Sequence, residues 1–268
     1  MSNDNHYALI LGSSSGFGKS SAIQLAKMGY NIFGMHLDVG TNKKHAELLA
    51  EEIRSYGVKC LFFNKNAADE AQRKEIVAIL KEELINDNDA KIRVYIHSLA
   101  FGALGPIISH NREELINQRK IEMTMNVMGN SFLFWAQDLF LENMFCENAR
   151  IISLTSSGSI RAMKGYGAVS AAKAALEAYT RQLAVELAPY KITVNALMPG
   201  VTDTPAAQKL PEFQRLKEVS ASHNPYGRNT IPDDVAKAIA LMIDEKSYWI
   251  TGQTIGVDGG ESICNAFE

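Results

Sequence analysis

The sequence has few cysteines and no long apolar run, and both absences narrow the class of protein. Its three cysteines among 268 residues lie far apart without C-x-x-C spacing, which argues against a disulfide framework or a zinc site. No window approaches the roughly 18 apolar residues of a membrane-spanning helix. Residues 1–6 are polar and do not begin a signal peptide. We therefore expect a cytoplasmic protein without a membrane partner or a bound metal.

The chain also lacks an excess of charge of one sign. A net charge of −3 and an isoelectric point near 6.1 provide no basic surface for nucleic acid. The sequence contains no repeat, low-complexity tract or linker, so residues 1–268 are predicted to form a single domain.

Short apolar runs alternate with longer segments of helical periodicity. The runs predict strands at 7–11, 31–35, 59–63, 93–97, 150–154, 193–197 and 254–257. The segments between them predict helices at 18–28, 43–56, 70–85, 112–145, 168–187 and 232–244. This alternation predicts an α/β fold of the Rossmann type: one doubly wound, mostly parallel seven-stranded sheet with helices on both faces.

Residues 202–231 form the only long stretch in which we find no clear periodicity. The stretch contains Pro205, Pro211 and Pro225, and loops of this length in compact domains are usually lids or binding loops. A disordered insertion is the alternative. A mobile helical substrate lid is favoured by apolar residues at roughly helical spacing: Leu210, Phe213, Leu216 and Val219.

A glycine-rich turn follows the first predicted strand and opens the first predicted helix. It reads Gly12-Ser13-Ser14-Ser15-Gly16-Phe17-Gly18, that is, G-x-x-x-G-x-G. A dinucleotide pyrophosphate needs close backbone approach and free N–H groups at a helix N-terminus, and glycine permits both. Glycine is also common in such turns for steric reasons alone. The position in the first βαβ unit favours the nucleotide, with contacts from Gly12, Ser14, Ser15, Gly16, Phe17 and Gly18.

This glycine spacing resembles that of the short-chain dehydrogenase/reductases, and the likeness extends over nearly the whole chain. His97-Ser-Leu-Ala100 stands where the family has N-N-A-G, and Met125-Asn126-Val127 matches its helical asparagine segment. Pro199-Gly200 with Thr204 matches P-G-x-x-x-T, and 257–260 match the C-terminal signature V-D-G-G. The resemblance implies further cofactor contacts at His36, Asn66, Ala67, Ser98, Ala100, Lys173, Gly200, Val201 and Thr204. An ordinary turn residue is the other interpretation of Asn66.

The expected catalytic tyrosine is displaced. Most members of the family carry Y-x-x-x-K, but the residue four before Lys173 is Val169, and the tyrosine is Tyr166, seven before. On a helix, a residue four positions away is rotated by about +40° around the axis, and one seven positions away by about −20°. A tyrosine at either position therefore lies on nearly the same face as the lysine. The Y-x6-K spacing resembles enoyl-acyl-carrier-protein reductases, and 157–161 and 173–181 resemble the enoyl reductase III branch. Ser156 departs from the commoner enoyl reductases, which have a second tyrosine there, and matches the general family's catalytic serine.

The resemblance implies roles for four catalytic residues. Tyr166 would donate to the thioester oxygen when hydride reaches C3 of an enoyl thioester, and Lys173 would lower the phenol pKa and bond the nicotinamide ribose. Ser156 is either a second donor or a strand-end cap. Asn126 either holds a water, kinks its helix, or is an ordinary helix-interior residue. His97 is interpreted as structural rather than as a metal ligand.

The cofactor preference depends on the end of the second predicted strand. An acidic residue there would bond the ribose hydroxyls of NAD, but the position holds His36, with Asp38 two residues on. Lys43 and Lys44 follow, whereas the glycine turn has Ser15 where NADP-preferring relatives often have a basic residue. The enoyl reductase III resemblance implies NADPH, and NADH is the alternative.

The resulting hypothesis is an enoyl-acyl-carrier-protein reductase of fatty acid synthesis that uses NAD(P)H. A 3-oxoacyl-thioester reductase, a short-chain carbonyl reductase, is the alternative. A non-catalytic nucleotide-sensing protein would be expected to lack Tyr166 or Lys173. The substrate is expected to be an acyl thioester on acyl carrier protein or coenzyme A. By resemblance, 168–187 and 251–261 would pack between the subunits of a homotetramer.

Overall fold

The protein is built around a parallel sheet of seven strands. The computed structural model describes residues 6–264, and the strand order is β3-β2-β1-β4-β5-β6-β7. Every neighbouring pair is parallel. The strands are β1 (His6–Leu11), β2 (Asn31–His36), β3 (Cys60–Asn64), β4 (Lys91–His97), β5 (Phe145–Leu154), β6 (Thr193–Pro199) and β7 (Thr254–Val257). The predicted fold class is confirmed.

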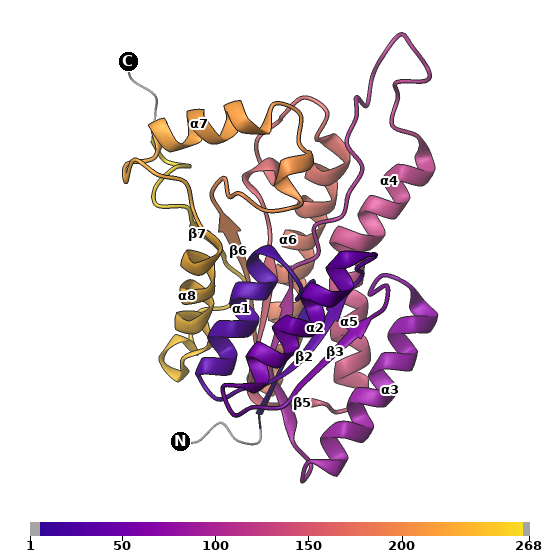
Figure 1. Ribbon diagram of the computed structural model, residues 1–268, viewed down its shortest axis with the longest axis vertical. Helices are drawn as coiled ribbons and strands as arrows, with labels where there is room; N and C mark the ends of the chain where they lie inside the picture. The colour runs from indigo at the N-terminus through magenta and orange to yellow at the C-terminus, as the bar shows by residue number, and fades with distance from the viewer. Residues whose placement is uncertain (1–5, 265–268) are drawn as a thin grey trace.

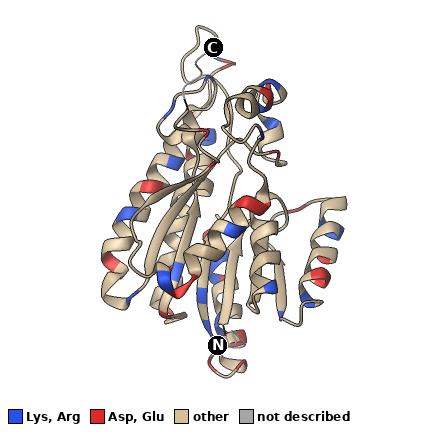
Figure 2. Cartoon of the chain, turned by 90° about the vertical axis from the view of Figure 1, so that its left-hand side faces the viewer, with Lys and Arg blue, Asp and Glu red and all other residues tan. Residues whose placement is uncertain are grey.

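Helices cover both faces of the sheet (Figure 1). They are α1 (Gly16–Lys27), α2 (Thr41–Arg54), α3 (Glu70–Asn86), α4 (Gln118–Met125), α5 (Ser131–Leu141), α6 (Gly167–Leu187), α7 (Phe213–His223) and α8 (Pro232–Ile243). None of these helices is long and apolar enough to cross a bilayer within residues 6–264. Lysine and arginine are interspersed with aspartate and glutamate along the outer helices (Figure 2).

Two apolar cores form because side chains alternate between the faces of each strand. In β1, Tyr7, Leu9 and Leu11 pack with α3, α5 and α6, whereas Ala8 and Ile10 pack with α1, α2 and α8. Burial of each large apolar side chain contributes roughly 1.5–3 kcal/mol. The two cores hold the carboxyl ends of the parallel strands β1 and β4 side by side, and the order in which strands are added to the sheet reverses between them, since β2 and β3 lie on one side and β5 to β7 on the other. Ligands of open α/β sheets bind at such a reversal point.

The prediction of one helix over 112–145 is wrong. Residues 98–117 form an irregular segment that rises beside α4 (Figure 1), followed by α4, a π-helical turn at Asn126–Asn130 and α5. Asn117 begins α4, because its side chain accepts a hydrogen bond from the Lys120 N–H at 2.9 Å. Asn143, with a φ of 52°, follows α5 and turns the chain into β5, which starts five residues earlier than predicted.

The segment 202–231 contains a helix where the spacing of its apolar residues favoured one. It contains a 3-10 turn at Ala207–Lys209 and the helix α7, which lies beyond the carboxyl end of β6 (Figure 1). It is also not the only long irregular stretch, since 98–117 is comparable. Proline and glycine at 102, 105 and 106 interrupt that second stretch, although its apolar residues mimic a helical pattern.

Two buried arginines lie on the neighbouring strands β4 and β5. Tyr7 of β1 pairs with Ile92 and Ala8 pairs with Val94, so Arg93 is an inserted residue of β4 against β1. Arg93 and Arg150 are 7% and 2% exposed, and no carboxylate among residues 6–264 forms a salt bridge with either. Arg93 Nη1 and Arg150 Nε have no hydrogen-bond partner in that range. Other polar atoms of the two side chains form hydrogen bonds, with Tyr30 and Cys146 for Arg93 and with the Asn148 and Ala149 carbonyls for Arg150. Buried charge without an opposite charge costs stability, and burial and then Arg93 lower the pKa of Arg150.

Candidate active site

The glycine turn after β1 is packed too closely for side chains. A Cβ on Gly12, whose φ is 86°, would lie 2.6 Å from the Ser98 carbonyl oxygen, and one on Gly18 would lie 2.0 Å from the Gly12 oxygen. The N-cap of α1 is Ser15, whose side chain makes no capping hydrogen bond with any described residue. The first-turn N–H groups of α1 are therefore available to an anion such as a pyrophosphate.

A cavity of about 350 Å³ opens over this turn at the carboxyl edge of the sheet. Its wall combines the turns after β1, β2, β3 and β4 with the start of the 202–231 segment. Eleven of the residues expected to contact a cofactor line it: Gly12, Ser14, Ser15, Gly16, Phe17, His36, Asn66, Ala67, Ser98, Ala100 and Thr204. Outside this lining lie Gly18, Lys173, Gly200 and Val201.

The far end of the cavity contains a histidine–aspartate pair. His36 is the last residue of β2, and its Nδ1 lies 2.9 Å from Asp38 Oδ2. Burial lowers the pKa of His36, and the Asp38 charge partly opposes this effect. Asn64 holds the loop, because its side chain accepts from the Asp38 N–H and donates to the Asp38 carbonyl, both at 2.9 Å. The carboxylate of Asp38, which lines the cavity, is thus hydrogen-bonded to His36.

The loop after β3 is tied to the helices behind it. The Trp135 indole N–H donates to the Ala67 carbonyl at 2.8 Å, and Asn126 Nδ2 donates to the Ala68 carbonyl at 2.9 Å. Asn66 Oδ1 accepts from the Ala68 N–H at 3.0 Å. Asn126 also begins the π-helical turn, so it lies at a break in the helix rather than inside a regular one. The anchoring by Trp135 was missed, since nothing in the sequence pairs residues 68 positions apart.

Tyr166 lies immediately before the first turn of α6, as its N-cap. Its ring packs against Gly158, where a Cβ would lie 2.5 Å from Tyr166 Cε1. Burial raises the pKa of Tyr166, and a hydrogen bond with Ser156 partly offsets this. Ser156 Oγ also accepts from the Gly158 N–H at 3.2 Å, so this serine both caps a turn and contacts the phenol.

Lys173 is buried on α6 and directed at β5. Its side chain is 4% exposed, and its Nζ donates to the Leu154 carbonyl at 2.6 Å. Burial lowers the pKa of the ammonium from 10.5 to about 8, with a smaller opposing effect of the Glu177 charge. Our sequence analysis did not single out Glu177, although a glutamate four residues after a lysine on a predicted helix is a recognisable signal.

His97, at the end of β4, is part of the packing. Its Nε2 lies 2.8 Å from Ser131 Oγ, and its ring meets Phe132 edge to face. Burial lowers the pKa of His97 well below its usual value, and the nearby Lys173 charge adds to the effect. His97 is thus a buried, neutral imidazole that is hydrogen-bonded through Nε2, which fits a structural role, although its Nδ1 has no hydrogen-bond partner among residues 6–264.

Comparisons with known proteins agree with this geometry. A family model described as Enoyl-(Acyl carrier protein) reductase matches residues 12–262. The uncharacterized oxidoreductase YjdA of Bacillus subtilis (strain 168) is 31% identical over 255 residues, 94% of this chain and 95% of YjdA. The chain belongs to the short-chain dehydrogenase/reductase superfamily. It is an NAD(P)H-dependent oxidoreductase.

Two further relatives of this short-chain dehydrogenase/reductase differ in the reaction that their names state. The 3-oxoacyl-[acyl-carrier-protein] reductase FabG of Thermotoga maritima is 28% identical over 258 residues, 94% of this chain and 96% of FabG. The enoyl-(acyl-carrier-protein) reductase of Anaplasma phagocytophilum, solved in complex with NAD, has a TM-score of 0.82 at 24% identity. That alignment covers 99% of this chain and 95% of the other.

The residues of this reductase fit a nicotinamide dinucleotide. The bare glycine turn and the uncapped start of α1 would hold the pyrophosphate, and the Asn66–Ala67 wall would hold the adenine. NAD(P)H, when bound, supplies the hydride. The chain itself supplies a phenol at the start of α6, a hydroxyl beside it and a buried ammonium, which together can hold and protonate a carbonyl oxygen.

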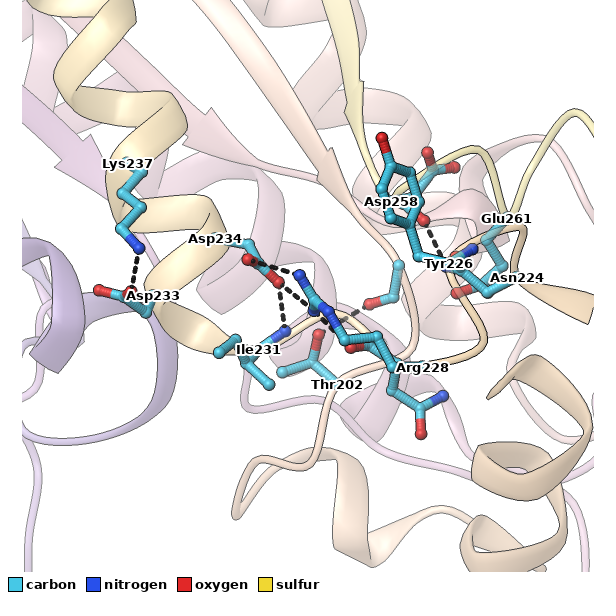
Figure 3. Close-up of polar contacts among 12 residues, drawn as sticks. Thr202, Asn224, Tyr226, Arg228, Ile231, Asp233, Asp234, Lys237, Asp258 and Glu261 are labelled. Atoms are coloured by element: carbon cyan, nitrogen blue, oxygen red, sulfur yellow. Dashed lines mark hydrogen bonds and ion pairs between the residues drawn. The ribbon is translucent and has the colours of Figure 1, made fainter. Parts of the chain in front are cut away.

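The loop after β6 in this reductase is held by the C-terminal segment (Figure 3). Glu261 Oε2 accepts from the Val201 N–H at 3.0 Å, and a Cβ on Gly200 would lie 2.6 Å from the same oxygen. Asn224 Nδ2 donates to the Asp258 carbonyl at 2.8 Å. Gly200 and Val201 therefore shape the loop from behind the cavity lining. Glu261 was another residue that our sequence analysis did not identify.

The 202–231 segment is anchored at one end and reaches the cavity at the other. A bidentate ion pair joins Arg228 to Asp234 at 2.7 and 3.0 Å next to the start of α8 (Figure 3). At the other end, Lys209 Nζ lies 5.6 Å from the centre of the Phe101 ring. This arrangement places α7 between a fixed end and a cavity-facing end.

Proposed function

We propose that the protein is an enoyl-acyl-carrier-protein reductase that reduces trans-2-enoyl thioesters in fatty acid synthesis. The supporting observation is the displaced tyrosine: Tyr166 caps the start of α6, seven residues before Lys173, and the four-residue position holds the apolar Val169. Enoyl reduction leaves negative charge on the thioester oxygen after hydride arrives at C3. A phenol held at that oxygen stabilises the charge and can protonate it.

A 3-oxoacyl-thioester reductase is the second candidate, and one observation favours it. Ser156 contacts Tyr166, which provides two hydroxyl groups for a ketone oxygen. A purified sample should be assayed with crotonyl and acetoacetyl thioesters of coenzyme A and of acyl carrier protein, each with NADPH and with NADH. We expect turnover of crotonyl thioester to exceed that of acetoacetyl thioester. The reverse order would refute enoyl reduction in favour of the second candidate.

We propose NADPH as the preferred reductant. His36 stands where an acid would repel the 2′-phosphate, and Asp38 is already bonded to the imidazole Nδ1. The ratio of kcat/KM for the two cofactors in the assay above tests this choice.

The proposed assembly is a homotetramer. Its proposed substrates are acyl thioesters of acyl carrier protein or of coenzyme A. Val185 on α6 is 72% exposed, and Trp249, two residues before the 251–261 segment, is 86% exposed, so apolar side chains are available on or next to the expected interface segments. Light scattering at micromolar concentration should return four times the mass of one chain. A monomer mass would refute the assembly without affecting the reaction.

A further inference from the structure

Glu177 is a carboxylate enclosed between α6 and β5. Glu177 is 9% exposed and Thr155 is 6% exposed. The Thr155 hydroxyl donates a hydrogen bond to Glu177 Oε1 at 2.5 Å. Glutamate is rarely buried unless a partner compensates for its lost hydration. One hydroxyl is a weak compensation for a full charge, so the position calls for a cationic neighbour.

That neighbour is Lys173, one helical turn earlier. Residues four apart lie on the same face of a helix, and both side chains turn from α6 towards the end of β5. They bond consecutive residues of the chain there: Lys173 Nζ reaches the Leu154 carbonyl, and Glu177 accepts from Thr155. The two hydrogen bonds therefore fix the ammonium and the carboxylate on the same side of α6, next to consecutive residues at the end of β5. No salt bridge joins the two groups among residues 6–264, so the carboxylate acts on the ammonium through space.

We propose that Glu177 is a positioning residue that keeps Lys173 charged and aimed at the active site, and that Thr155 fixes the carboxylate for this purpose. The proposal rests on the use of Lys173 by the oxidoreductase, not on the choice between enoyl and 3-oxoacyl substrates. Glu177 itself acts only through Lys173.

The other ionisable groups around Lys173 do not supply this charge. His97 approaches from β4 and is neutral because burial lowers its pKa well below its usual value. Tyr166, at the start of α6, has a raised pKa and is also neutral near pH 7. Burial brings the pKa of Lys173 down to about 8, and Glu177 is the group that opposes this effect. Removal of the Glu177 charge should let Lys173 lose its proton close to neutral pH.

The test is the pH dependence of kcat/KM in Glu177→Gln, measured with whichever thioester the wild type reduces. A neighbouring opposite charge shifts a pKa by about one unit or more, so the alkaline limb should move about one pH unit lower. If the apparent pKa of the alkaline limb falls from 8 to 7, kcat/KM of the variant should be lower than that of the wild type by roughly eightfold at pH 8.5 and by less than about 1.5-fold at pH 6.5. Thr155→Val should move the limb in the same direction, and Thr155→Ser should restore it.

The matched control is Glu186→Gln, which removes an exposed glutamate from the same helix and should leave the profile unchanged. A loss in Glu177→Gln that is equal at every pH would show a purely structural role and overturn the proposal. An unmoved limb in Thr155→Val would overturn it even if Glu177→Gln failed to fold. The dissociation constant of NAD(P)H against pH, followed by cofactor fluorescence, provides a second readout that does not depend on the acyl substrate.

Discussion

A single added methyl group should test whether the observed placement of Tyr166 matters for catalysis. In Gly158→Ala, the new Cβ would lie 2.5 Å from Tyr166 Cε1 and 2.8 Å from Cδ1. Ordinary contact begins at 3.4 Å, so the ring must retreat by roughly 0.9 Å (3.4 minus 2.5). The φ of Gly158 is not positive, so an alanine can adopt the same backbone conformation without strain.

The expected loss follows from this displacement. A catalytic group moved by about 1 Å costs roughly 10²-fold in turnover. The glycine turn at 12–18 is untouched, so the dissociation constant of NAD(P)H should stay within about twofold, because the pyrophosphate contacts do not change. Turnover of the thioester, cofactor titration and the melting temperature should be measured together. Ser157→Ala, which adds no atom against the ring, is the control.

The reasoning is checked by repeating the substitution in a Tyr166→Phe background. If Gly158→Ala acts through the phenol, it should cost little there, because the group that it displaces is already inactive. An undiminished loss in that background would show that the methyl acts elsewhere. Retention of more than half of wild-type turnover by Gly158→Ala alone would show that the ring position is not constrained as described.

Four further predictions follow from separate features. Tyr166→Phe should lower turnover by roughly 10²–10⁴-fold with cofactor affinity nearly intact, and more than a tenth of wild-type activity would contradict phenolic catalysis. His36→Asp should shift the NADH/NADPH ratio of kcat/KM towards NADH by about tenfold, because the new acid bonds ribose hydroxyls and repels a 2′-phosphate; an unchanged ratio would count against His36. Arg93→Met should raise the melting temperature by about 2–4 °C, since it removes a buried charge without a carboxylate partner among the described residues, worth about 1 kcal/mol; a clear drop would show that the hydrogen bonds of Arg93 to Tyr30 and Cys146 outweigh that cost. Hydrogen exchange across 209–222 should slow when cofactor and substrate bind together, and equal exchange with and without ligands would refute a closing lid.

The local apolar pattern was sufficient to predict the seven strands. β7 matches its predicted bounds of 254–257, and α6, Gly167–Leu187, differs from 168–187 by one residue. This works because the choice of strand or helix for these segments depends mostly on side chains next to one another in the chain. The glycine turn could be predicted for a similar reason, since its function depends on a short run of backbone.

The error at 112–145 shows where local pattern is insufficient. The residues at 145–149 are compatible with a helix continuing from α5, but Phe145 pairs with Ile92 of β4 and becomes part of the sheet. Strand pairing is a contact between distant segments, and only the assembled sheet decides it. The inserted Arg93 depends in the same way on the pairing of β4 with β1.

The same distinction between local pattern and distant contact applies to the active site. The sequence by itself determined that Tyr166 and Lys173 stand seven apart and that serines and glycines follow β1, because these are facts of spacing. Only the tertiary structure decided that Glu177 meets Thr155, 22 residues earlier, and that Glu261 holds the loop at Val201, 60 residues earlier. Such contacts arise only when helix, strand and C-terminal segment pack together, and the same packing buries Lys173 beside Glu177, so that burial lowers its pKa and the Glu177 charge opposes this effect.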